Sequence, residues 1–152
     1  MKIKTVYEKI DEIAPFKYTD KFDNTGLLIG DMENEVSFVV LCLDVTNDII
    51  LETLKIGKSG GLIISHHPVI FNPLKSVKSD SIVYQLIKNN INYIAAHTNY
   101  DVALGGITDQ MADLLNFENT GEPLEFVCEE NAKKIGYGKV CKCEITEIGR
   151  AS

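Results

Sequence analysis

The amino-acid sequence predicts an α/β fold in which a mixed sheet is covered by helices on both faces. Between residues 5 and 115, apolar runs of strand length alternate with segments of helical periodicity. The runs are apolar at consecutive positions, as strands are when both faces of the sheet are buried. A chain of 152 residues can bury a substantial core. We therefore expect a single α/β domain over residues 1–152.

The expected elements begin and end at recognisable signals. Thr5 to Ala14 has helical spacing and ends at Pro15, and Thr46 is a suitable cap for a helix that runs to about Ile56. Further helices are expected after Ser79 or Ser81 and after Gly105-Gly106. Phe22–Gly30 is predicted to be a turn followed by a short apolar strand. The other predicted strands lie in Ser37–Leu43, Leu62–Ile64, Tyr93–Ala96, Leu124–Cys128 and Lys139–Ile145. Because Ser37–Leu43 is apolar on both faces, we expect helices to cover it on both sides.

Composition and charge exclude several classes of partner. The formal net charge is −7 and the sequence pI is about 4.9, which argues against binding of nucleic acid or anionic lipid through bulk electrostatics. The longest apolar run, Val36–Val45, is too short to span a bilayer, and no signal peptide is visible. The four cysteines form no C-x-x-C pair. These features predict a cytoplasmic protein with reduced thiols and without a membrane or nucleic-acid partner.

Two adjacent histidines follow one of the buried strands. His66 and His67 come just after Leu62–Ile64, and Pro68 then prevents regular strand pairing because it lacks an N–H. Ligands in α/β proteins are often bound where strands open into loops. Neighbouring strand side chains point to opposite faces, so the two rings reach one ion only if the backbone turns, or else they face two ions. A pair of histidines hydrogen-bonded to loop backbone is the alternative.

A third histidine, His97, ends the next predicted strand, and Asp101 follows it by four residues. If the two strands are neighbours, three imidazoles and one carboxylate converge at the same edge of the sheet. These donors suit zinc, iron or manganese, and a carboxylate could bridge two ions. The alternative for Asp101 is a loop residue that caps the backbone around Val102. The sequence therefore predicts a divalent-metal site.

Other polar residues are weaker candidates. Asp44 follows a strand and could line the same cleft, but capping of the Thr46 helix explains it equally well. Asp23 and Asn24 are interpreted as turn formers rather than ligands. Cys141 and Cys143 would share one side of a strand, yet they have no partner pair for a structural zinc site. No Walker loop, G-x-G-x-x-G motif or serine nucleophile elbow is present.

Four segments together resemble the dinuclear-metal-centre family of GTP cyclohydrolase I type 2 homologues, also called NGG-one-interacting-factor-three-like proteins. The resemblance covers the N-terminal half of the family pattern. The matching segments are Asp-Asn-Thr-Gly-Leu-Leu-Ile-Gly at 23–30, Ser-His-His-Pro-Val-Ile-Phe at 65–71, Ala-His-Thr-Asn-Tyr-Asp at 96–101 and Gly-Gly-Ile-Thr-Asp at 105–109.

The resemblance implies an α/β fold that holds two divalent metal ions in a cleft and assembles into a homo-oligomer, often a hexameric ring. His66, His67 and Asp101 match the family's metal ligands, and Asp101 is the expected bridge. His97 lies in the same motif and is expected at the metal edge or behind it, where it would orient a ligand or a water. The family name implies metal-activated water that attacks a purine ring.

The chain departs from the family pattern in several places. Phe22 stands where the family usually has Trp, Thr108 where Asn is common, and Lys139 where the family's G-x-G-R-x-G has Arg. Longer members supply a His-x-x-x-Glu pair near the C-terminus, and this chain has no histidine after His97. The remaining ligands would then come from another chain, from water or from nowhere, or the chain is a truncated form.

Two functions follow from these observations. The first is a divalent-metal-binding protein of this family with an incomplete dinuclear site, because three shared ligands hold two ions weakly. The alternative is a metal-dependent hydrolase that acts on a nucleotide or another phosphate-bearing small molecule. In that case His97 is the candidate general base.

Overall fold

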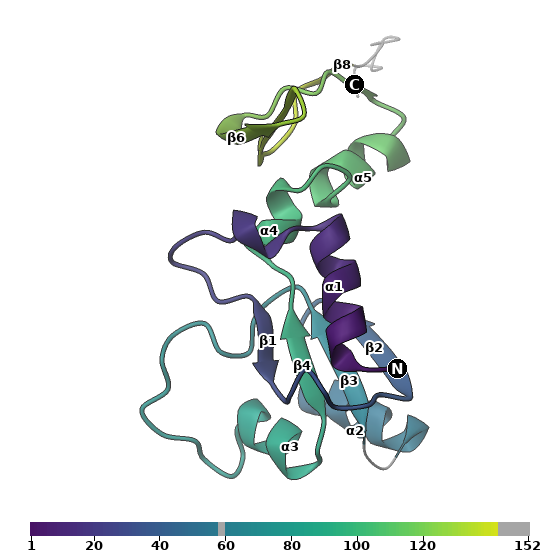
Figure 1. The fold of residues 1–152 in the computed structure, drawn as a ribbon, viewed down its shortest axis with the longest axis vertical. Coiled ribbons are helices and arrows are strands. Elements are labelled where there is room, and N and C mark those ends of the chain that lie inside the picture. The colour runs from purple at the N-terminus through teal and green to yellow at the C-terminus, as the bar shows by residue number, and fades with distance from the viewer. Residues whose placement is uncertain (58–59, 143–152) are drawn as a thin grey trace, which may run out of the picture. The chain divides into compact units, whose positions relative to one another are not determined.

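The computed structural model describes residues 1–57 and 60–142 and divides into two compact units, Met1–Tyr100 and Asp101–Ser152. The first unit contains a four-stranded sheet, and the second contains short strands after a helix (Figure 1). Each unit is described separately below. In the described ranges, no helix combines the length and the apolar character that crossing a membrane requires.

The sheet of the first unit is mixed, with strand order β1-β4-β3-β2. Strands β2, β3 and β4 run parallel to one another, and β1 is antiparallel to β4. The strands are β1 (Gly26–Ile29), β2 (Phe38–Cys42), β3 (Gly61–Ser65) and β4 (Asn92–Ala95). The predicted adjacency of the two histidine-bearing strands is confirmed, because β3 pairs with β4.

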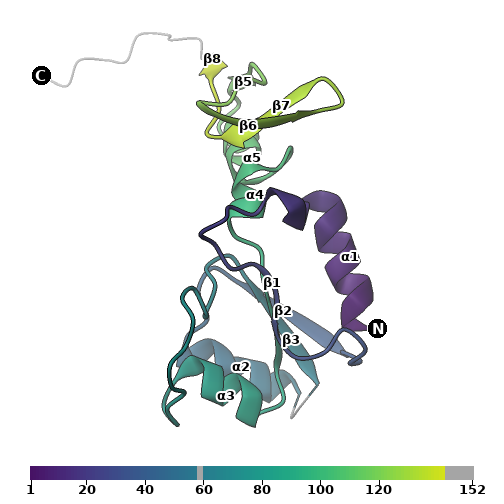
Figure 2. The ribbon, with the colours of Figure 1, turned by 60° about the vertical axis from the view of Figure 1, so that its left-hand side comes forward.

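Helices cover both faces of this sheet, as predicted. Helix α1 lies on one face, and α2 and α3 lie on the other (Figure 2). The helices of the unit are α1 (Ile3–Ile13), a short 3₁₀ turn η1 (Phe16–Tyr18), α2 (Asn47–Ile56) and α3 (Ile82–Lys88). Thr46 and Ser81 cap α2 and α3, since their hydroxyls accept from the N–H groups of Ile49 and Tyr84.

The core lies in two layers that follow the alternation of side chains along β3. Leu62 packs with Ile3, Val36 and Ile94 on the α1 side of the sheet. Ile63 points to the opposite face. There it joins a cluster that contains Val45, Ile50, Leu86, Ile91, Tyr93 and Ala95. The strand order places β3 and β4 in the interior of the sheet, and core residues cover both of their faces, so the ends of these strands are held in place.

The expectation that helices cover both faces of β2 is wrong for one face. Val40 and Cys42 pack against the α2 and α3 layer, but Val39 is 42% exposed and Leu41 is 74% exposed. The reason lies in the strand order, which places β2 at the edge of the sheet. An apolar run cannot distinguish an interior strand from an edge strand with an uncovered face.

The second unit contains α5 and two small antiparallel pairs. Helix α4 (Thr98–Val102) begins directly after His97 and reaches the start of this unit, and α5 covers Ile107–Leu114 after Gly106. Strand β6 (Glu125–Glu130) confirms the predicted Leu124–Cys128 strand in its position and pairs with β7 (Lys133–Tyr137). Strand β5 (Glu118–Asn119) pairs with β8 (Cys141–Lys142).

The C-terminal half of the strand pattern differs from the prediction. The proposed Lys139–Ile145 strand is described only as β8, because residues 143–145 lie outside the described residues. Strand β7 was not predicted. It is joined to β6 through Asn131 and Ala132, which both have positive φ, as a tight hairpin turn requires. An Asn-Ala pair lacks the glycine that usually signals this turn in a sequence.

Candidate metal centre

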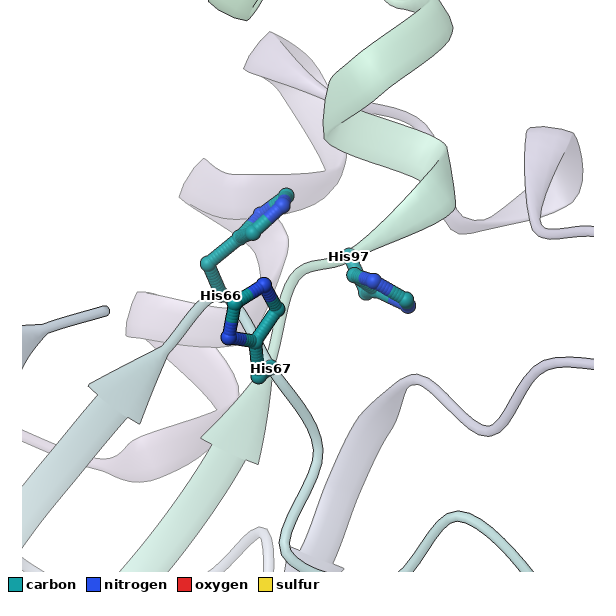
Figure 3. A group of neighbouring side chains, drawn as sticks. All are labelled: His66, His67 and His97. Atoms are coloured by element: carbon teal, nitrogen blue, oxygen red, sulfur yellow. The ribbon is translucent and has the colours of Figure 1, made fainter. Parts of the chain in front are cut away.

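The ends of β3 and β4 bring the three histidines together. Ser65 lies opposite Ala95 in the parallel register, so His66 and His67 leave β3 beside the point where His97 follows β4. The three side chains lie next to one another beyond the ends of the two strands (Figure 3). Each offers one ring nitrogen, and these nitrogens all lie within 4.8 Å of one another. The predicted convergence of three imidazoles is therefore present in the structure.

The backbone after Ser65 is shaped by hydrogen bonds, which explains how two adjacent histidines reach the same space. The N–H groups of His66 and His67 donate to the carbonyls of Cys42 and Leu43 (3.3 and 3.0 Å). The hydroxyl of Tyr93 donates to the His67 carbonyl (3.0 Å) and accepts from the Val69 N–H (3.2 Å). The loop therefore turns away from the strand path, and the strict alternation of faces no longer applies.

Tyr93 is the internal support of this loop, because its fully buried hydroxyl also contacts the Ser65 hydroxyl at 2.6 Å. Burial raises the pKa of the Tyr93 phenol above its ordinary value, so the group is neutral at physiological pH.

Tyr93→Phe should lower the free energy of unfolding by about 1–3 kcal/mol, since the Val69 N–H and the His67 carbonyl lose a buried partner. Urea denaturation checks this value. Tyr84→Phe, on the surface of α3, should change it little, and equal effects of the two substitutions would contradict the assigned role.

Each of the three rings uses Nδ1 for a protein partner. Nδ1 of His66 bonds the Ala96 carbonyl (3.1 Å), Nδ1 of His67 bonds Asp44 (2.7 Å) and Nδ1 of His97 bonds Asp23 (3.0 Å). Carbonyl and carboxylate oxygens only accept, so in each neutral ring the proton lies on Nδ1 and the lone pair on Nε2. This is the tautomer in which an imidazole binds a metal through Nε2.

Asp23 has a larger role than the turn former that the sequence indicated. It does accept from the Asn24 N–H (2.8 Å), as a turn residue would. Its carboxylate is also fully buried and accepts from His97, from the Thr98 N–H (3.1 Å) and from the Thr98 hydroxyl (2.6 Å). Burial alone would raise the pKa of this carboxyl, but the hydrogen bonds from Thr98, His97 and Asn24 outweigh it and lower the pKa.

Asp44 contacts the histidine cluster. Its Oδ1 lies 2.7 Å from Nδ1 of His67, and both side chains are about half exposed. The hydroxyl of Thr46 itself caps helix α2, so Asp44 is not required for that cap. Of the two sequence-based interpretations, a position beside the histidines therefore agrees with the contact between Asp44 and His67.

The remaining sequence-based candidates are Asp101, Cys141 and Cys143. Asp101 lies on α4, one turn after His97, and begins the second unit, so its role as a bridging ligand stays a prediction. Cys141 is a free thiol on β8, and Cys143 lies outside the described residues. Sequence reasoning missed Asp23 as a partner of His97. The available signal was its position at the start of the first segment of the family resemblance.

The donor set fits a divalent first-row metal ion. Neutral imidazoles suit zinc, iron and manganese to different degrees, and ligating histidines usually donate their second ring N–H to a carboxylate or a carbonyl. All three rings here have such a partner. His66, His67 and His97 are therefore the residues that could hold the ion, and Asp23, Asp44 and Ala96 orient them.

Comparison with known proteins shows which family this chain resembles. The chain is 36% identical to a GTP cyclohydrolase 1 type 2 homolog of Clostridium perfringens over 77% of this chain and 45% of that protein. It is 33% identical to the corresponding protein of Clostridium acetobutylicum over 95% of this chain and 54% of the relative. The crystal structure of a Bacillus cereus protein related to NIF3 matches 84% of this chain and 35% of that chain, with 36% identity and a TM-score of 0.77.

The matches also define the extent of the relationship. The chain spans about half the length of these curated relatives, and about a third of the Bacillus cereus chain. The family model described as Duf34/NIF3 (NGG1p interacting factor 3) matches residues 1–149. The chain therefore belongs to the Duf34/NIF3 family.

Proposed function

We propose that this protein binds divalent metal ions at the ends of β3 and β4, through His66, His67 and His97. The observation that carries the proposal is the convergence of three imidazole nitrogens within 4.8 Å. The hydrogen bond that each ring makes through Nδ1 also supports the proposal, because it leaves Nε2 as the metal-binding nitrogen in all three rings. Histidines without a shared role would not be expected to have the same tautomer. Such an ion supplies positive charge and Lewis acidity to whatever oxygen or nitrogen group approaches it.

The experiment is a titration of the full chain after treatment with a chelator. Zn²⁺, Mn²⁺ and Fe²⁺ are added separately, and calorimetry gives the affinity and the stoichiometry. We expect His67→Ala to abolish binding, because it removes one of three ligands. Asn72→Ala is the control in the same loop, where its side chain is exposed, and it should bind like the unaltered chain. Unchanged metal content in His67→Ala, measured by elemental analysis, would refute the assignment.

The two-ion site implied by the family resemblance makes a separate prediction. A second ion requires further ligands, and Asp101 is the candidate bridge between two ions. A dinuclear site would give a stoichiometry of two per chain, and Asp101→Asn would reduce it. The substrate and a homo-oligomeric assembly also remain proposals, since the chain spans only part of its relatives.

The alternative function is metal-dependent hydrolysis of a nucleotide or another phosphate-bearing small molecule. We expect little turnover of GTP or of p-nitrophenyl phosphate by the metal-loaded chain, because the histidine-glutamate pair of longer members is absent from this sequence. Release of formate from GTP and of p-nitrophenolate are the two measurements. Robust turnover that is lost in His67→Ala would establish the enzyme instead of a binding protein.

A further inference from the structure

We propose that the second unit contains a binding site for the phosphate group of a small metabolite, in a cavity built around Lys139. The cavity has a volume of about 440 Å³, and the residues that line it all belong to the second unit. This volume is in the range of small-molecule sites, roughly 300–1,000 Å³, so there is room for more than a phosphate ion. The inference is independent of the proposed metal binding, because none of the three histidines lines this cavity.

The burial of Lys139 is the central observation. Its side chain is only 3% exposed, although lysine is among the residues that are least often buried. An ammonium group has three N–H donors, and burying them without acceptors costs free energy. Among the described residues, its ion-pair partner is Oδ1 of Asp109 at 3.3 Å, which is longer than a strong charge-assisted hydrogen bond. The ammonium group therefore retains the capacity to donate to an oxyanion in the cavity that Lys139 lines.

Asp109 does not fully satisfy Lys139, because both of its carboxylate oxygens have other donors. Oδ2 accepts from the Gly105 N–H (2.7 Å), and Oδ1 accepts from the side-chain amide of Asn119 (2.7 Å). Asp109 lies in the first turn of α5, so the carboxylate is held between this helix and β5. Its interaction with Lys139 is one of three that share the same two oxygens.

The backbone on either side fixes the position of Lys139. Gly138 has a φ of +65°, which side chains rarely adopt, so the chain turns sharply after β7. Val140 then donates its N–H to the Glu122 carbonyl (2.9 Å) and accepts from the Thr120 N–H (3.1 Å). Lys139 lies between these two constraints. Its side chain is therefore already ordered, and a ligand would lose little affinity to the cost of ordering it.

The charges around the cavity favour an anion. Its lining contains three lysines, Lys133, Lys134 and Lys139, and two acidic residues, Asp109 and Glu122. Lys139 pairs with Asp109, and Lys134 pairs with Glu122 at 2.6 Å. Lys133 has no acidic partner within the described part of the chain, so three positive and two negative charges leave one positive charge in excess. In a chain with a formal net charge of −7, composition does not predict this local excess.

The donors suit phosphate better than carboxylate. A lysine ammonium acts as a point charge that binds phosphate from any direction, whereas planar carboxylates match the two-pronged geometry of arginine. A phosphate monoester carries nearly two negative charges at neutral pH, so it can draw on the charges of both Lys133 and Lys139. Leu104 and Ala132 also line the cavity and offer apolar contact to the organic part of the ligand.

The test is a titration of the full chain with glycerol 3-phosphate, after treatment with a chelator and dialysis. Isothermal titration calorimetry gives the affinity. Lys139→Met removes the charge and keeps most of the aliphatic length. Lys142→Met is the matched control, because Lys142 also makes an ion pair of 3.3 Å, with Glu118, but is 69% exposed. Amide hydrogen exchange of β6 and β7 shows whether each variant keeps the fold of the second unit.

We expect Lys139→Met to weaken the binding of glycerol 3-phosphate by about 10–100-fold, the range for losing a hydrogen bond to a charged group. Lys133→Met lies at the exposed start of β7, where the fold is not at risk, and should weaken binding by about 2–5-fold. Lys142→Met should change the affinity by less than about 2-fold. Lys139→Arg keeps the positive charge and should retain most of the affinity.

Several outcomes would overturn the proposal. They are no binding of glycerol 3-phosphate by the unaltered chain, equal effects of Lys139→Met and Lys142→Met, and acetate bound as tightly as glycerol 3-phosphate. The same titration of His67→Ala separates this cavity from the histidines: unchanged affinity supports the proposal, and loss of binding refutes it. If Lys139→Met loses the protection of β6 and β7, Lys133→Met decides, and an affinity equal to that of the unaltered chain refutes the site.

Discussion

Ile63→Ala should lower the free energy of unfolding by about 2–5 kcal/mol, the range for truncation of a large aliphatic side chain in a core. Ile63 is 0% exposed and lies in β3, an interior strand paired with β2 and β4. Its side chain packs in the cluster between the sheet and the α2 and α3 layer. The loss of stability should lie toward the upper end of this range, because strands on both sides restrict how far the cavity left by the Ile63 side chain can collapse.

Urea denaturation followed by circular dichroism measures this effect. Val39→Ala is the control, since it removes aliphatic volume from β2 at a position that is 42% exposed. It should lower the free energy of unfolding by less than about 1 kcal/mol. Similar losses for the two variants would show that the α2 and α3 side of the sheet is not the main core. Because β3 also leads into His66 and His67, Ile63→Ala should weaken metal binding as well.

Gly136→Ala should disrupt the β6–β7 hairpin of the second unit. A Cβ atom at this position would overlap the Glu125 carbonyl oxygen, a backbone atom that cannot move without a change in strand pairing. No rotamer relieves this contact, because Cβ is fixed by the backbone. We expect a loss of about 3 kcal/mol or more in the local stability of the hairpin, which is in the range of severe packing errors.

Amide hydrogen exchange is the measurement, since it resolves the stability of separate segments. Exchange should increase in β6 and β7 and remain nearly unchanged in β3 and β4, because the sheet of the first unit has its own core. Glu129→Ala is the matched control on the exposed side of β6, where it should have little effect. Unaltered protection of the hairpin in Gly136→Ala would contradict the observed strand register.

Local signals in the sequence were sufficient for most elements of the first unit. Apolar runs predicted β3 and β4, and Thr46 was correctly assigned as the cap of α2, because each signal depends on neighbours within a few residues. The second unit was less predictable. Its strands are short and largely exposed, so apolar periodicity is weak, and the Asn131-Ala132 turn carries no glycine.

In the candidate site, too, features that depend on near neighbours in the sequence were predictable, and contacts between distant segments were not. Histidines after two buried strands were visible in the sequence, and a parallel arrangement of these strands made their convergence an expectation. The residues that hydrogen-bond to Nδ1 of each histidine could not be predicted from the sequence. Asp23 lies 74 residues from His97, and an aspartate before asparagine near a glycine has the local pattern of a turn.

By itself, the sequence determined that this is an α/β protein of the Duf34/NIF3 family whose three histidines end two buried strands. Only the tertiary structure decided that β2 lies at an edge with Leu41 exposed, and that Asp23 is buried against His97 and Thr98. The physical reason is that helix caps and apolar runs act between near neighbours in the chain. Strand order, burial and hydrogen bonds between distant segments arise only when the chain packs.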